Sequence, residues 1–118
     1  EPKARTGSGL ATLQDHIRAS INENWPIERM ARVAATSGRT LARRFQEETG
    51  TTPLNWLKVE RVSRAAELLE NGAIPLPDIW EICGFGSAET FRREFRKLMG
   101  VQPLGYRERL GAPSMNPS

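Results

Sequence analysis

Apolar residues recur every three or four positions along most of this chain, which is the spacing of amphipathic helices. The first such stripe predicts a helix from Leu10 to Asn24, ended by the sequence Trp25-Pro26. This stripe consists of Leu10, Leu13, Ile17 and Ile21. The pattern continues after Pro26 and predicts a short second helix over residues 27–34.

A third helix is expected over residues 38–49, because Ser37 can accept its free amide hydrogens and Gly50 can end it in the left-handed conformation. Thr52 and Pro53 then supply an N-cap and a first-turn proline. They predict a long fourth helix that runs to about Glu70 and spans on the order of 26 Å.

The second half of the chain repeats this order. A loop over residues 73–77 precedes a short helix over 78–83, and Ser87 is placed to cap a longer helix over 88–99 that Gly100 ends. Pro103 opens a last short turn over residues 104–110.

The two halves also repeat residue by residue. A shift of fifty positions superimposes seven identical residues, namely Ser37, Thr40, Arg43, Phe45, Gly50, Pro53 and Leu54 on Ser87, Thr90, Arg93, Phe95, Gly100, Pro103 and Leu104. Upstream of the turn a shift of 49 aligns Met30 with Ile79, Ala34 with Cys83 and Ala35 with Gly84. Each copy has the outline of a helix-turn-helix.

An all-helical chain with two such units is therefore expected. We expect the first subdomain over residues 10–52, a connector helix over 53–71 and the second subdomain over 72–110. Residues 1–9 and 111–118 are expected to be disordered tails, because they carry too little apolar surface to offset the entropy of ordering.

Composition restricts the classes of function. The 118 residues suffice for one ordinary domain or two very small ones, and 38% hydrophobic with 26% charged residues is typical of a soluble protein. No apolar run approaches the ~20 residues of a membrane span, and the single cysteine fits a reducing, cytoplasmic location. One cysteine and one histidine leave no internal disulfide and no metal-ligand cluster, so neither a cofactor nor a metal is expected. The net charge of +3 permits a nucleic acid partner.

The outward faces of the two longer helices carry the candidate chemistry. If Leu41 and Phe45 face inward, Arg39, Thr40 and Arg43 face outward, and the same geometry turns Glu89, Thr90 and Arg93 outward in the second copy. Such residues suit a helix in the major groove of DNA, where arginine contacts guanine, threonine a thymine methyl group and glutamate a cytosine amino group. The alternative for any single exposed arginine is a solvated helix surface, and the shared register of Arg43 and Arg93 favours binding.

Other residues are expected to contact phosphates. These are Ser37, Arg44, Arg61, Ser87, Arg92, Arg96 and Lys97. For Arg61 and Arg64 on the long helix, structural ion pairs with neighbouring glutamates are an equal alternative.

Several conspicuous residues are expected to be structural. Cys83 falls at an inward position of the repeat and is expected to be a packed thiol, whereas His16 is expected on a helix surface. The sequence Gly84-Phe85-Gly86 lacks the third glycine of a dinucleotide fingerprint. The three tryptophans are expected in the core or between helices, and no catalytic constellation indicates an enzyme.

Three segments together resemble the DNA-binding domain of the AraC/XylS family of bacterial transcription regulators. They are SGRTLARRFQEETGTTPLNWL in the first unit, RVSRAAELL on the connector and ICGFGSAETFRREFRKLMGVQPLGYR in the second unit. The resemblance covers roughly Leu10 to Leu110, and the last segment is the most diagnostic.

The resemblance implies seven helices and two recognition helices that enter successive major grooves. By position it implies base contacts from Arg39, Ala42 and Arg43 in the first unit, and from Glu89, Thr90 and Arg93 in the second. The chain departs from the family pattern at Trp80, where a small alanine is usual, and at Ala42, which can at most touch a thymine methyl group.

These observations predict the sequence-specific, double-stranded DNA-binding part of a bacterial transcription regulator. The sequence GFGSAETFRR is also similar to the branch of the family that carries an amidotransferase-like N-terminal sensor domain, which is absent from this chain. The alternative from another class is a helical protein-interaction module, one that docks on RNA polymerase.

Overall fold

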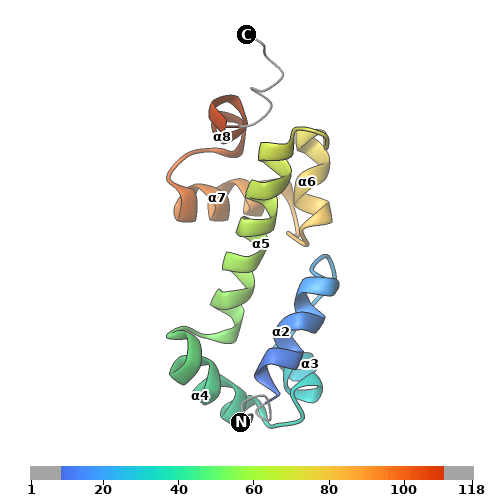
Figure 1. Cartoon of the computed structure of the whole chain (residues 1–118), viewed down its shortest axis with the longest axis vertical. Coiled ribbons are helices and arrows are strands. Elements are labelled where there is room, and N and C mark those ends of the chain that lie inside the picture. The colour runs from blue at the N-terminus through green and yellow to red at the C-terminus, as the bar shows by residue number, and fades with distance from the viewer. Residues whose placement is uncertain (1–8, 111–118) are drawn as a thin grey trace. The chain divides into compact units, whose positions relative to one another are not determined.

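Residues 9–110 form an all-helical structure, described here from a computed structural model (Figure 1). No strand occurs in this range, and the expectation of an all-α chain with seven helices is confirmed. The predicted tails lie outside the described residues, except for Gly9. The helices are α2 (Leu10–Ala19), α3 (Ile27–Val33), α4 (Gly38–Thr49), α5 (Pro53–Asn71), α6 (Leu76–Ile82), α7 (Ala88–Met99) and α8 (Pro103–Leu110).

The chain divides into two compact units, and the division falls within α5, between Leu57 and Lys58. Each unit has its own apolar core. The core of the first unit consists of Leu10, Leu13, Ile17, Trp25, Met30, Ala31, Ala34, Leu41, Phe45, Trp56 and Leu57. The core of the second consists of Val62, Ala65, Ala66, Leu69, Ile79, Cys83, Phe85, Phe91, Phe95 and Tyr106. The long helix therefore contributes side chains to both cores.

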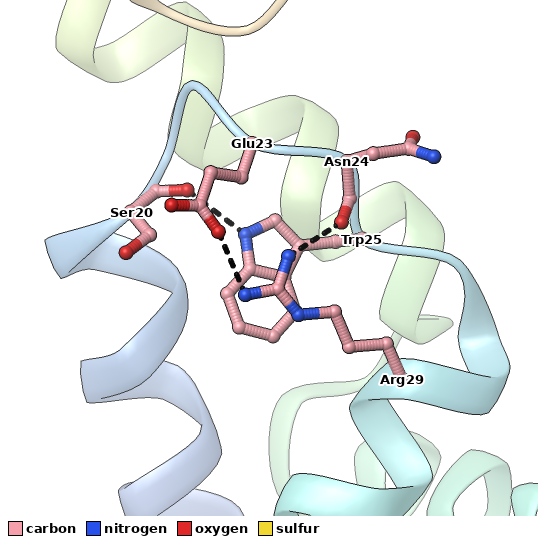
Figure 2. A network of polar contacts seen from close by, with 5 residues as sticks. All are labelled: Ser20, Glu23, Asn24, Trp25 and Arg29. Atoms are coloured by element: carbon pink, nitrogen blue, oxygen red, sulfur yellow. Dashed lines mark hydrogen bonds and ion pairs between the residues drawn. The ribbon is translucent and has the colours of Figure 1, made fainter.

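The first helix ends earlier than its apolar stripe predicts. It stops at Ala19 rather than Asn24, and the following segment is organised around Trp25 (Figure 2). The indole Nε1 of Trp25 donates to the carbonyl oxygen of Ser20 at 3.0 Å, a carbonyl just after α2 that also accepts from the amide of Glu23 at 3.0 Å.

Arg29 from α3 completes this network (Figure 2). Its guanidinium lies 3.8 Å from the centre of the Trp25 ring, donates to the carbonyl oxygen of Asn24 at 2.8 Å and pairs with the Glu23 carboxylate at 2.7 Å. A cation over an indole face is a favourable contact. These contacts fix the loop between α2 and α3 in a conformation that is incompatible with a longer α2.

The turn between the two helices of each unit has a left-handed residue at the same position. Ala35 has a φ of 57° in the first unit, and Gly84 has a φ of 89° in the second. Glycine adopts this conformation readily, whereas alanine is strained in it. The two residues that align in the repeated sequence therefore also share a left-handed backbone conformation.

Both longer helices begin and end as their sequences predict. Ser37 Oγ accepts from the amide of Thr40 at 3.1 Å, and Ser87 Oγ accepts from the amide of Thr90 at 3.1 Å. Gly50 and Gly100 end the two helices with left-handed φ values of 79° and 81°. The long helix α5 is capped by Thr52, whose Oγ1 accepts from the amide of Asn55 at 3.1 Å.

The second unit differs from expectation in two places. Helix α6 begins at Leu76, inside the predicted loop, because Pro77 fits the first turn of a helix, where no partner is needed for its nitrogen. The predicted last turn is an eight-residue helix, α8. Tyr106 on α8 donates its hydroxyl to the Glu70 carboxylate, and Arg107 donates to the carbonyl oxygen of Ile74 at 2.7 Å. These contacts hold α8 in the second unit.

Candidate nucleic-acid interface

Helix α4 presents a polar face opposite its buried side chains. Leu41 and Phe45 are completely buried in the first core, as predicted. The residues on the opposite side differ in their exposure to solvent. Arg39, Ala42 and Arg43 are exposed, and Thr40 and Arg44 are half-buried. The helix therefore offers a face of two arginines separated by one turn, with the small Ala42 between them.

Arg43 is engaged within its own helix. Its Nη1 lies 3.2 Å from both carboxylate oxygens of Glu47, one turn further along α4. Both side chains are about 60% exposed, at 59% and 60% respectively, so solvent screens this pair. Arg43 can exchange this partner for another acceptor at small cost.

Helix α7 carries the denser positive face. Phe91 and Phe95 are buried as predicted, and the exposed positions include Glu89 and Arg93. Thr90 is half-buried, and its Oγ1 accepts from the Ser87 hydroxyl at 3.1 Å. The Thr90 hydroxyl oxygen is thus engaged at the helix N-terminus.

A cavity of about 430 Å³ lies along the positive side of α7. Four cationic side chains and one amide line it, namely Arg92, Arg93, Arg96, Lys97 and Gln102. The last turn of α7 contains Arg96 and Lys97, where the helix dipole favours cations. Guanidinium and ammonium groups gathered in this way suit an anionic oxygen ligand such as a phosphate.

A buried carboxylate beside this face was missing from the sequence-based interpretation. The side chain of Glu94 is only 7% exposed, and its Oε2 lies 3.5 Å from Arg93 Nε and 3.9 Å from Lys58 Nζ. The signal was available, because Phe91, Glu94 and Phe95 have the spacing of one apolar stripe. A charged residue in such a stripe is rarely buried without a partner.

The predicted phosphate contacts have different surroundings. Arg92, Arg96 and Lys97 are exposed on α7, whereas Ser37 and Ser87 already act as N-caps through their hydroxyl oxygens. Whether these residues contact phosphate stays a prediction.

The two arginines of the long helix α5 have different surroundings. Arg64 pairs with Glu67 at 3.1 Å, which is the expected structural ion pair. Arg61 is half-buried, and burial lowers the pKa of its guanidinium from the usual value. The side chain of Arg61 is therefore less exposed to solvent than the cationic side chains on α7.

The residues expected to be structural are structural. Cys83 is completely buried, and burial raises the pKa of its thiol to about 11, which disfavours the reactive thiolate. His16 is an exposed residue of α2, and Trp25 and Trp56 lie in the first core. Across residues 9–110 no three potential ligand side chains gather as a metal site, and no helix in that range is long and apolar enough for a bilayer.

Trp80 is accommodated at the edge of the second core. It is half-buried and lines an apolar cavity of about 470 Å³ together with Leu76, Pro77, Phe91 and Leu104. Its counterpart in the first unit, by the shift of 49, is the buried Ala31. The position that holds a small buried residue in the first unit thus holds a large, half-buried one in the second.

The comparisons with known proteins identify the family. A family model described as a helix-turn-helix domain matches residues 30–109, which is more than half of the chain. The chain belongs to the AraC/XylS family. The similar proteins are named as transcription regulators or activators. The chain is similar to the transcriptional activator RhaR of Pectobacterium carotovorum, with 32% identity over 108 residues, which cover 92% of this chain and 38% of RhaR.

Another similar AraC/XylS protein is a putative AraC-like transcription regulator of Streptomyces antibioticus. It is 34% identical over 107 residues, which cover 84% of this chain and 35% of that protein. The chain therefore spans only about a third of the length of such relatives.

Solved structures of AraC/XylS domains share the fold. The DNA-binding domain of AdpA, determined in complex with a target DNA, has a TM-score of 0.84 and 32% identity, covering 94% of this chain and 98% of that one. An AraC-type regulator from Chromobacterium violaceum has a TM-score of 0.82 and 26% identity, covering 94% of this chain and 99% of that one. The expected family and fold are confirmed.

Proposed function

We propose that this chain is the sequence-specific, double-stranded DNA-binding part of a bacterial transcription regulator. Helices α4 and α7 would lie in the major groove as recognition helices, one from each unit. The observation that carries the proposal is the exposed cationic face of α7, whose Arg92, Arg93, Arg96 and Lys97 line one cavity. The likeness to the AdpA domain, which was determined with its target DNA, supports it.

Base contacts are proposed for Arg39, Thr40, Ala42 and Arg43 on α4 and for Glu89, Thr90 and Arg93 on α7. The exposure of Arg39, Arg43, Glu89 and Arg93 favours this assignment, whereas the half-buried threonines would act through their methyl groups. The repeat supports assigning the same role to Arg43 and Arg93. Arg43 lies two positions after the buried Leu41, and Arg93 lies two positions after the buried Phe91.

Phosphate contacts are proposed for Arg92, Arg96 and Lys97, and for Ser37, Arg44, Arg61 and Ser87. The two serines cap their helices, so the free amides at those helix ends would contribute alongside them. Such contacts set the position of the protein on the duplex and carry no sequence information.

The arrangement on DNA follows from the two units. We propose that α4 and α7 occupy successive major grooves, which requires their binding surfaces to meet the duplex about one helical turn, ~34 Å, apart. At ~1.5 Å per residue, the 19 residues of α5, the helix that joins the units, span about 28 Å. A cytoplasmic, non-enzymatic regulator with a sensor domain outside this chain would fit the greater length of the relatives.

Docking on RNA polymerase or another protein is the alternative. Leu98 and Leu104 are about half exposed, at 47% and 53%, and would suit an apolar contact. A salt titration separates the two functions. When binding neutralises several phosphates, the logarithm of the association constant falls against log salt with a slope of about −0.9 per contact, and we expect a slope steeper than about −3. A flat slope would contradict DNA binding.

A further inference from the structure

Arg43 and Arg93, which occupy the same position in the repeat, contact their carboxylate partners through different nitrogen atoms. Arg43 is bound to Glu47 through a terminal nitrogen, Nη1, at 3.2 Å. Arg93 faces Glu94 through Nε at 3.5 Å. A bidentate contact with guanine O6 and N7 uses two donors of one guanidinium. The pairing of Arg93 leaves both terminal nitrogens available for such a contact, whereas that of Arg43 occupies one of them.

The carboxylate that faces Arg93 is itself fixed in place. Glu94 is only 7% exposed and lies between the buried Phe91 and Phe95 in sequence, and the oxygen that faces Arg93, Oε2, also has Lys58 Nζ at 3.9 Å. By contrast, Glu47 is 60% exposed and can move with its partner. An arginine side chain that is already ordered loses less conformational entropy when it binds.

We propose that Glu94 is a positioning residue, which holds Arg93 through Nε and presents the two terminal nitrogens to a base. Glu47 has the opposite effect, because it competes with a base for Nη1, one of the two terminal nitrogens of Arg43. The second unit is therefore the more discriminating of the two. This inference rests on the proposed function of Arg93.

Glu47 also supplies a matched control. Glu94→Gln and Glu47→Gln each remove one negative charge from a recognition helix, so both change the general attraction to DNA in the same direction. The two changes differ in the contact that they remove, because Glu94 is a buried carboxylate that faces Arg93 Nε, whereas Glu47 is an exposed carboxylate that binds Nη1 of Arg43. If only the change in charge matters, discrimination between base pairs should change in the same way in both variants. If Glu94 positions Arg93, discrimination should fall in Glu94→Gln and not in Glu47→Gln.

The test uses the full chain and a duplex selected from random sequences. The base pair at which Arg93→Ala loses preference is identified first, and each variant is then titrated on duplexes that differ at that pair. We expect Glu94→Gln to lower discrimination there by about threefold to tenfold, a part of the gain from one bidentate contact. We expect Glu47→Gln to retain or raise discrimination at the base pair that Arg43 contacts.

A double-mutant cycle separates positioning from a general structural role. If Glu94 acts through Arg93, adding Glu94→Gln to Arg93→Ala leaves discrimination unchanged. An equal loss with and without Arg93 would overturn the proposal, as would unchanged discrimination in the single Glu94→Gln variant. If Arg93→Ala itself alters no base preference, the proposed function of Arg93 fails as well.

A measurement without DNA tests the contact itself. The Nε–H signal of Arg93 in a ¹⁵N-edited NMR spectrum should exchange slowly with water in the parent and rapidly in Glu94→Gln. Lys58→Met provides a second variant that keeps Glu94, and slow exchange should persist in it. Rapid exchange in the parent would overturn the proposal, whatever the DNA affinity, because no fixed contact would exist.

Discussion

Removing the two matched arginines one at a time tests whether the repeat reflects shared function. Arg43→Ala and Arg93→Ala remove side chains that are 59% and 63% exposed, so neither change creates a cavity in a core. A bidentate arginine–guanine contact contributes about 1–3 kcal/mol of discrimination. Both variants should therefore weaken binding to the selected site while leaving thermal stability almost unchanged.

The two losses should differ in size. A base contact through Nη1 of Arg43 replaces its pair with Glu47, and an exposed pair one helical turn apart contributes about 0.3–0.5 kcal/mol. That cost is subtracted from the net gain of its base contact, so Arg43→Ala should weaken binding by the smaller amount. Arg93 keeps its terminal nitrogens available and should show the full loss.

Fluorescence anisotropy with a labelled duplex at fixed salt measures both effects. A panel of single base-pair substitutions then shows where each variant has lost its preference, and the two positions should lie in different half-sites about one turn apart. Arg109→Ala, which removes an exposed arginine of α8, controls for the loss of one positive charge. If both recognition-helix variants bind the selected site and its substituted forms like the parent, the argument from register is refuted.

Two further predictions concern the fold. Ala35→Gly should raise the free energy of unfolding by up to about 1 kcal/mol, because it relieves the left-handed φ of 57° that its counterpart Gly84 adopts without strain; urea unfolding that shows a loss instead would contradict this account of the turn. The Glu70 hydrogen bond and burial raise the pKa of Tyr106 from 10.0 to about 12, so the neutral phenol is favoured in the folded state. Its contribution is complete below pH 10 and is lost as pH rises towards 12, hence the stability gap between the parent and Tyr106→Phe should narrow over that range.

The features that depend on local chemistry could be predicted from the sequence. The caps Ser37 and Ser87 and the buried phenylalanines Phe45, Phe91 and Phe95 follow from spacing and from residue type alone. The repeat added the correspondence of Arg43 and Arg93, which no single helix would have indicated.

Features set by contacts across the chain could not be predicted in the same way. The early end of α2 depends on the geometry of Arg29 over Trp25, four positions away, which periodicity does not reveal, whereas α8 depends on Tyr106 and Arg107 reaching residues more than thirty positions earlier. Glu94 was overlooked although it shares the apolar stripe of Phe91 and Phe95, because its partner Lys58 lies on another helix, α5. Partners this distant leave no periodic signal in the sequence.

Hydroxyl-radical footprinting of the full chain on its selected duplex tests the central claim most directly. Two recognition helices in successive major grooves predict two protected backbone segments on one face of the duplex, centred about 10–10.5 base pairs apart. Arg93→Ala should reduce the protection of one segment, and Arg43→Ala should reduce the protection of the other. A single protected segment, or two segments on opposite faces of the duplex, would contradict the account.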